Sequence, residues 1–181
     1  LRDGEEVAAE PSEIVGPDTT HLPLFLGSVR SFFETDTSLE DLYLHLLEES
    51  GGRLVEAIRI IAAGEPTLVH CTVGKDRTGV TVALALSAVG ADREAVIEDY
   101  ALTESQLPPE RNRRIAAYLT ELHPEAVNAV ALATQSPAPV MRRLLEMVDE
   151  RWGSAADYLR AQGMTDAELA ALTAALVEPV E

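Results

Sequence analysis

The sequence predicts an α/β fold, in which a mostly parallel sheet is flanked by helices and the C-terminal half of the chain is helical. The first observation is a short apolar run, Thr67–His70, followed by a glycine-containing loop and an apolar helix from Thr78 to Val89. The second is the abundance of Ala and Leu at helical spacing, with aromatic residues at only 4%. A length of 181 residues suits one domain, so we expect residues 1–181 to fold as a unit.

Two strands and two helices are predicted in the N-terminal half. Thr67–His70 is short and apolar, which indicates a buried strand, and His21–Leu26 indicates a short strand whose proline marks an edge or a bend. Leu39–Glu49 is predicted to be a helix with Ser38 as its N-cap. Apolar residues then recur at helical spacing over Leu54–Ala62, which predicts the next helix.

The C-terminal half is predicted to contain helices separated by proline and glycine breakers. Ser154 and Thr165 are suitable N-caps, and Glu168 lies at capping-box spacing from Thr165. We expect part of this half, roughly Leu102 to Ser136, to act as a lid. The other helices are expected at Asp92–Thr103, Glu110–Leu122, Pro124–Ala133 and Val140–Arg151.

The formal net charge of −17 limits the classes of partner. Nucleic-acid binding needs a basic stripe, so we expect no nucleic-acid partner. No apolar stretch is long enough to span a bilayer and no signal peptide is visible, so we expect no stable membrane insertion. We expect a cytoplasmic location, with secretion by another route left open. The one cysteine, Cys71, cannot form an intrachain disulfide.

The loop after Thr67–His70 has the spacing of an oxyanion site. Cys71 and Arg77 are separated by five residues, so the loop can curl round a phosphate with the thiol below it and the guanidinium beside it. The helix that begins near Thr78 would aim its positive end at the same point, and Gly74 permits the tight turn. The residues expected to bind the phosphate are Thr72, Val73, Gly74, Lys75, Asp76 and Arg77.

The same electrostatic field would activate Cys71. The pKa of a free cysteine thiol is about 8.5, and a helix N-terminus with nearby cations lowers this pKa to roughly 3.5–7.5. Cys71 is therefore expected to be a thiolate nucleophile at neutral pH. Arg77 can hold two phosphate oxygens in a planar fork, which a lysine would not match. The alternatives are a buried, inert cysteine and a surface arginine.

The loop resembles the signature of the protein tyrosine phosphatases, since residues 70–79 read HCTVGKDRTG. The GKDRTG version is similar to that of an atypical bacterial group whose members act on phosphotyrosine and on phosphoinositides. Asp92–Tyr100 and Trp152–Ser154 resemble further segments of that group, and Leu1–Val7 resembles a segment that follows a core strand. The opening segment usual in the group, Asn-aromatic-Arg-Asp-Leu-Gly-Gly, has no match, so the chain resembles the phosphatase domain without its first part.

The resemblance implies a cysteine-dependent phosphate monoester hydrolase that needs no cofactor and no metal. Its substrate would be a phosphotyrosine protein or a phosphoinositide, and its oligomeric state stays open. Cys71 would form a phosphocysteine intermediate, and Arg77 would stabilise the transition state. Asp76 matches the loop aspartate that serves the group as general acid, and Asp36 and Asp41 are alternative acids.

Other polar residues have open roles. Thr78 would donate a hydrogen bond to the leaving thiolate or cap the helix. Lys75 would contact a second phosphate or a lipid head group, or remain solvated. His70 is expected to order the loop. A basic cluster would face the substrate, hold the lid or form a solvated helix face, and it consists of Arg111, Arg113 and Arg114.

Two other classes of function stay open. The first is a phosphate-binding module that has lost turnover, although the presence of Cys71, Asp76, Arg77 and Thr78 argues against such a loss. The second is a sulfurtransferase of rhodanese type, which also places a cysteine in an anion-binding loop. The run GKDRTG argues against that class.

Overall fold

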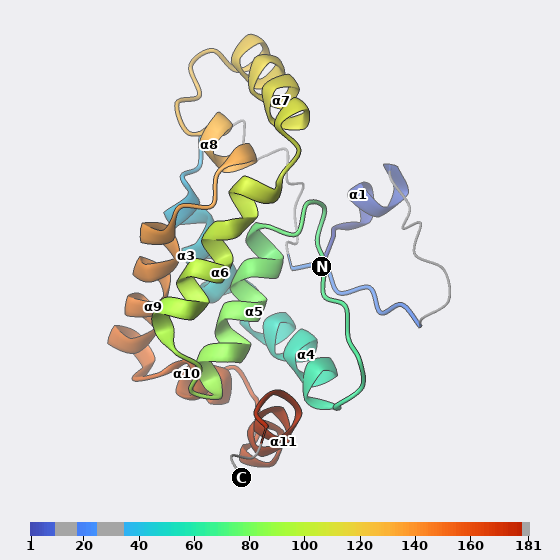
Figure 1. Ribbon diagram of the computed structural model, residues 1–181, viewed down its shortest axis with the longest axis vertical. Helices are drawn as coiled ribbons and strands as arrows, with labels where there is room; N and C mark the ends of the chain where they lie inside the picture. The colour runs from blue at the N-terminus through green and yellow to red at the C-terminus, as the bar shows by residue number, and fades with distance from the viewer. Residues whose placement is uncertain (10–17, 25–34, 179–181) are drawn as a thin grey trace.

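The computed structural model describes residues 1–9, 18–24 and 35–178. Within these ranges every regular element is a helix (Figure 1), so the predicted helical C-terminal half is confirmed. The helices are, in chain order, α1 (Gly4–Ala9), α3 (Leu39–Glu49), α4 (Gly51–Ala62), α5 (Asp76–Ala88), α6 (Arg93–Gln106), α7 (Pro109–Leu122), α8 (Ala129–Thr134), α9 (Ala138–Trp152), α10 (Ala155–Ala161) and α11 (Asp166–Leu176).

The predicted α/β fold with a mostly parallel sheet is wrong for the described residues, which contain no strand. Thr67–His70 is an irregular connection between α4 and α5. It is not buried either, since the Leu68 side chain is 71% exposed. A strand needs a neighbouring strand to pair its N–H and C=O groups. The contact described there is instead a hydrogen bond from the main-chain nitrogen of Leu1 to the carbonyl of His70, at 3.0 Å.

The second predicted strand, His21–Leu26, is also absent as far as the structure describes it. Residues 21–24 have no strand structure, and residues 25 and 26 lie outside the described ranges. The buried Leu24 accepts a hydrogen bond from the Ser50 hydroxyl through its carbonyl. The Pro23 carbonyl accepts one from Arg53 at 2.6 Å. These contacts attach the segment to the start of α4 rather than to a sheet.

The helix predictions are largely confirmed, and so are three N-caps. α3 begins and ends as predicted, and the Ser38 hydroxyl accepts a hydrogen bond from the N–H of Asp41 at 3.1 Å. Ser154 caps α10 in the same way. Thr165 and Glu168 form the complete predicted capping box at α11. These caps satisfy N–H groups that have no acceptor inside a helix.

The predicted helix over Pro124–Ala133 begins later than expected, because α8 starts only at Ala129. The Asp36 carboxylate accepts hydrogen bonds from the N–H groups of Val127, at 3.1 Å, and of Asn128, at 2.6 Å. Asp36 itself has a positive φ of 49°, which aspartate tolerates better than most residues. This distant carboxylate therefore takes N–H groups that a longer helix would have used.

α5 lies at the centre of the helical body, where it contacts α3, α4, α6, α10 and α11 (Figure 1). Its Val80 and Leu84 side chains are fully buried. They belong to one apolar core together with Ile58 of α4, Ile97 of α6 and Met141 of α9. Because helices hold α5 on several sides, its N-terminal end and the preceding loop have a fixed place.

α7 and α8 lie at one end of the molecule and pack against each other (Figure 1). Leu119 of α7 and Ala129 and Ala133 of α8 form a small apolar cluster separate from the main core. Both helices fall within the segment predicted to be a lid, and that role stays a prediction.

Two leucine substitutions test this distribution of buried surface. Leu84→Ala should lower the free energy of unfolding by about 2–5 kcal/mol, because it leaves a cavity in the core. Leu68→Ala should change it by less than about 0.5 kcal/mol, because that side chain already lies in water. Urea unfolding followed by circular dichroism measures both. Similar losses in the two variants would contradict the exposed position of Leu68.

Candidate active site

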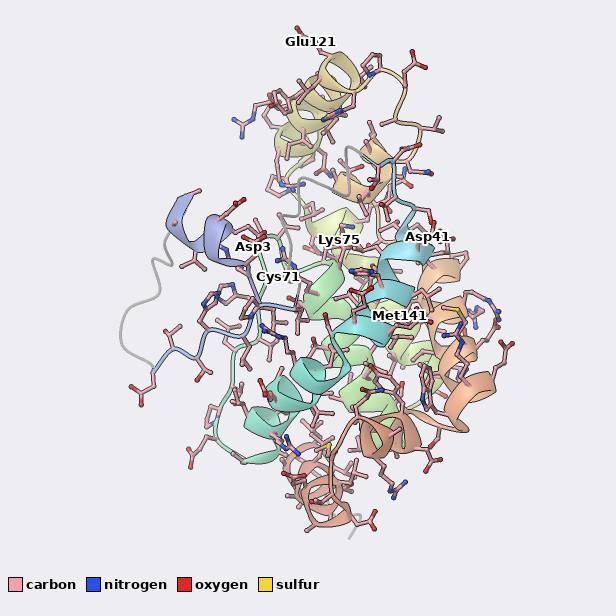
Figure 2. The ribbon with its side chains drawn as sticks, turned by 180° about the vertical axis from the view of Figure 1, so that it is seen from behind. Asp3, Asp41, Cys71, Lys75, Glu121 and Met141 are labelled. Carbon is pink, nitrogen blue, oxygen red and sulfur yellow. The ribbon has the colours of Figure 1, made fainter. Side chains whose placement is uncertain are left out.

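The loop between Thr67–His70 and α5 brings the predicted site residues to one point. Gly74 turns the loop with a φ of 73°, in the left-handed region that glycine adopts without strain. In Figure 2, Cys71 and Lys75 lie near the N-terminal end of α5. Cys71 thus lies next to the first turn of the most central helix.

The N-terminus of α5 lies at this loop and presents groups suited to binding an anion. The helix begins at Asp76, and the N–H of Gly79 donates to the carbonyl of Lys75 at 2.8 Å. The N–H groups of the first turn have no acceptor inside a helix, and the helix dipole adds partial positive charge at the same end. A loop of this kind leading into a helix N-terminus suits an oxyanion such as phosphate.

Cys71 is buried, yet the pKa of its thiol is lowered from the usual value. Burial alone raises this pKa, because it disfavours the charged thiolate. The charge of Arg77 and hydrogen bonds from the Thr78 side chain and N–H together lower it by more, while the Asp76 carboxylate opposes them. The result favours the thiolate, which is the nucleophilic form of cysteine.

Thr78 has a buried hydroxyl that, apart from its interaction with the Cys71 sulfur, has no hydrogen-bond partner among the described residues. It nevertheless lies near enough to the Cys71 sulfur to lower the pKa of that thiol. Buried polar groups are nearly always paired. This hydroxyl is therefore suited to donate a hydrogen bond to the Cys71 sulfur when that sulfur is a thiolate. The predicted capping role does not fall to Thr78, because the N-cap position of α5 is Lys75.

Arg77 is buried and forms a two-pronged ion pair with the Glu6 carboxylate. Nη1 of Arg77 lies 2.5 Å from Oε2, and Nη2 lies 2.7 Å from Oε1. Nη1 also donates to the carbonyl of Leu1 at 3.2 Å, and Nη2 donates to the hydroxyl of Thr72 at 3.2 Å. These contacts fix the plane of the guanidinium beside the loop. Burial lowers the pKa of Arg77, but its hydrogen bonds to Glu6 and the negative charges of Cys71, Glu6 and Asp76 together raise that pKa by more.

Glu6 is a site residue that the sequence did not reveal, except as part of the segment Leu1–Val7. Burial tends to raise its pKa, but hydrogen bonds from Arg77 and Thr72 and from the N–H of Asp3 lower it from 4.5 to about 2. Asp3 and Glu6 also cap α1 reciprocally, each carboxylate accepting from the other residue's N–H at 2.8 Å. That spacing of three residues was the available signal.

Asp76, the first residue of α5, is held through one of its two carboxylate oxygens. Oδ1 accepts a hydrogen bond from the Tyr43 hydroxyl at 2.9 Å and one from the Lys75 ammonium at 2.7 Å. The Tyr43 hydroxyl lies 2.5 Å from that of Tyr100. Neither tyrosine was singled out from the sequence, since buried tyrosines on two separate helices carry no motif.

Lys75 is turned inward rather than toward a ligand in solution. Its side chain is 1% exposed. Besides Asp76, its ammonium donates to the carbonyls of Leu132 at 3.1 Å and of Gln135 at 2.8 Å, at the end of α8. Lys75 therefore joins the loop to α8. In this arrangement its ammonium group donates its hydrogen bonds to other groups of the protein.

The alternative acids have other partners. Asp36 binds the connection that precedes α8, as described above. Asp41 lies on α3 (Figure 2), and its carboxylate accepts from the Ser38 hydroxyl at 2.7 Å. His70 adjoins the loop, where its Nδ1 lies 2.9 Å from the carbonyl of Cys71. Of the three candidate acids, Asp76 is the one whose charge acts on the pKa of the Cys71 thiol.

The basic cluster lies on α7. Arg111 hydrogen-bonds the carbonyl of Ala133 in α8 at 3.3 Å, and Arg113 pairs with Glu110 at 2.5 Å on an exposed face. Burial, together with the neighbouring Arg114, lowers the pKa of Arg111. Part of this cluster therefore holds α7 against α8.

Two kinds of feature are absent from the described ranges. The structure contains no group of three or more histidine, cysteine or carboxylate side chains arranged to hold a metal ion there. It also contains, in the same ranges, no helix long and apolar enough to cross a membrane.

A cysteine with a lowered pKa and an arginine beside it at a helix N-terminus are the features of cysteine-based phosphate-binding loops, and Cys71 and Arg77 have this arrangement. Comparison with known proteins gives the family. The sequence pattern of the tyrosine phosphatase family matches residues 1–178, and the chain belongs to that family.

Curated relatives of this chain are bacterial phosphatases. It is 36% identical over 124 residues to the triple specificity protein phosphatase PtpB of Mycobacterium tuberculosis. The matched stretch covers 63% of this chain and 45% of that protein. This chain is 26% identical over 137 residues to a tyrosine-protein phosphatase of Nostoc commune, which is 73% of this chain and 47% of that protein. The chain therefore spans about half the length of these relatives.

The lowered pKa of Cys71 gives a direct chemical prediction. The rate of alkylation by iodoacetamide, followed against pH by mass spectrometry, should show a midpoint below the ordinary value of about 8.5. The reading is specific, because the sequence has one cysteine. In Arg77→Ala the midpoint should move to higher pH, since Arg77 is the main cause of the lowering. A midpoint at the ordinary value in the unaltered protein would contradict this electrostatic picture.

The pKa of Glu6 gives a prediction about stability. Its depressed value means that the ion pair stabilises the fold above the unfolded pKa of 4.5, and that this stabilisation is lost as the pH falls toward about 2. Glu6→Gln should therefore lower the free energy of unfolding by about 2 kcal/mol at neutral pH. Urea titrations should show the difference between variant and parent narrowing as the pH falls from about 5 to about 2. A pH-independent difference would rule out the ion pair as its source.

Proposed function

We propose that this chain hydrolyses phosphate monoesters, phosphotyrosine foremost, through a phosphocysteine intermediate. The observation that carries the proposal is the buried Cys71, whose thiolate is favoured by Arg77 and by the first turn of α5. Membership of the tyrosine phosphatase family supports the same chemistry. The phosphate would bind to the N–H groups of residues 72–77 and to the Arg77 guanidinium.

In the first step the Cys71 thiolate attacks the phosphorus atom. A sulfur–phosphorus bond forms while the bond between phosphorus and the tyrosyl oxygen breaks. Asp76 in its protonated form gives its proton to that oxygen, so tyrosine leaves neutral. Arg77 and the loop N–H groups stabilise the charge on the three equatorial oxygens.

In the second step water attacks the phosphocysteine. The Asp76 carboxylate takes a proton from the water, a new phosphorus–oxygen bond forms, and the sulfur–phosphorus bond breaks. Thiolate is the leaving group, and the buried Thr78 hydroxyl, which has no other described partner of ordinary geometry, would donate a hydrogen bond to it. Inorganic phosphate and the thiolate enzyme are the products.

Activity on phosphoinositides or on phosphoserine and phosphothreonine is the second candidate. The relative from M. tuberculosis is named for triple specificity, which favours testing a broad range of phosphate esters. Lys75 would contribute to a polyanionic substrate only after leaving its contacts with α8 and Asp76. The wider specificity would therefore rest on groups other than Lys75.

Steady-state hydrolysis tests the proposal. The protein should release phosphate from a phosphotyrosine peptide, and Cys71→Ser should lower kcat by at least about a thousandfold, because the weaker nucleophile cannot form the intermediate. Phosphoinositides, a phosphoserine peptide and thiosulfate complete the panel. No difference between parent and variant on any phosphate ester would overturn the proposal in favour of a binding module. Turnover of thiosulfate alone would indicate a sulfurtransferase.

A further inference from the structure

We propose that Tyr43, itself oriented by Tyr100, is a positioning residue that holds Asp76 for proton transfer to the leaving group. The proposal rests on the proposed function, in which Asp76 is the general acid. The two tyrosines come from α3 and α6, outside the phosphate loop and outside its sequence signature.

The hydrogen bonds that link Tyr100, Tyr43 and Asp76 all run in one direction, with Asp76 as the final acceptor. Oδ1 of Asp76 accepts from the Lys75 ammonium, which has protons only to give, so this oxygen is an acceptor. The single hydroxyl proton of Tyr43 is therefore given to Oδ1. In the 2.5 Å contact between the tyrosines, Tyr43 then accepts and Tyr100 donates. The chain of donation is Tyr100 to Tyr43 to Asp76.

This direction decides which carboxylate oxygen carries the transferable proton. An oxygen that accepts two hydrogen bonds, one of them from an ammonium, is the worse place for a proton. All the hydrogen bonds of Asp76 to the described residues fall on Oδ1. The proton of the acid form thus belongs on Oδ2, and fixing Oδ1 from two sides fixes the direction of Oδ2.

The tyrosines can act as a rigid support because they are buried and packed. Tyr43 is fully buried and Tyr100 nearly so, and their rings meet edge to face with centroids 6.1 Å apart. Burial, with the nearby Asp76 charge, raises the pKa of Tyr43 well above its usual value, so it remains a neutral donor.

Gly79 gives an independent sign that Tyr100 has a required position. A Cβ atom at Gly79 would lie 2.8 Å from Cδ2 and 3.2 Å from Cε2 of Tyr100, closer than such atoms approach. The last glycine of the loop signature therefore makes room for the ring of Tyr100 against the first turn of α5. The ring that orients Tyr43 is held by the same turn that carries Asp76.

A merely structural role for Tyr43 would make a different prediction, so the test uses the leaving group. Loss of acid positioning slows esters of poor leaving groups more than esters of good ones, because a good leaving group departs without a proton. Phenyl phosphate resembles phosphotyrosine in its leaving group, and p-nitrophenyl phosphate has a much better one. A general loss of folded protein would lower both rates equally.

The variants are Tyr43→Phe and Tyr100→Phe, with Asp76→Asn as reference and Tyr158→Phe as matched control. Tyr158 is also fully buried, and its hydroxyl donates to the carbonyl of Leu47 at 2.8 Å, away from Asp76. Tyr43→Phe should lower kcat on phenyl phosphate about tenfold, and on p-nitrophenyl phosphate less than about threefold, with KM little changed. Tyr100→Phe should show the same selectivity more weakly.

The outcomes separate this proposal from the proposed function. Equal losses on both esters in Tyr43→Phe, or losses no larger than in Tyr158→Phe, overturn the positioning role while Asp76→Asn still shows the leaving-group effect. Absence of that effect in Asp76→Asn overturns the acid assignment and this proposal with it. If Tyr43→Phe does not fold by circular dichroism, Tyr100→Phe, which leaves the hydroxyl of Tyr43 in place, decides the question by the same ratio.

Discussion

The buried charge of Arg77 is the constraint on which the site depends. A buried cation left without its partner destabilises the fold, and the partner here is Glu6, contributed by α1. The core helices can fix the position of α5 and its loop without α1, but they cannot balance this charge. The short α1, capped by Asp3, is therefore part of the site, although it contributes no buried side chain to the core.

Three consecutive residues, the N-cap of α5 and its first two helical residues, connect the helix to the other parts of the site. Lys75 binds the end of α8, Asp76 binds Tyr43 of α3, and Arg77 binds Glu6 of α1. Successive side chains leave a helix about 100° apart, so one turn can reach three neighbours in different directions. The phosphate loop is thereby fixed by contacts from parts of the chain that share little contact with one another.

The separation along the chain between two interacting residues decides how well the sequence predicts their interaction. Ser38 caps α3, and the cap lies within one turn of the residues it serves, so a local pattern is enough. The spacing of Cys71 and Arg77 is local in the same sense. The apolar run Thr67–His70 suggested a buried strand, but no local pattern shows whether a neighbouring strand is there to pair with it. The pair of Glu6 and Arg77 joins residues 71 positions apart, and it follows no periodicity.

The arrangement of charges bears on how a protein with a net charge of −17 would bind the dianion of the proposed substrate. The two cations of the loop, Lys75 and Arg77, each face a carboxylate, so their charges are largely balanced before a ligand arrives. Attraction at the bottom of the loop then depends on the N–H groups and the dipole of α5, which act at short range and are fixed in direction. In the proposed function, such a site would recognise the shape of a phosphate group that has already entered, rather than attract anions from a distance.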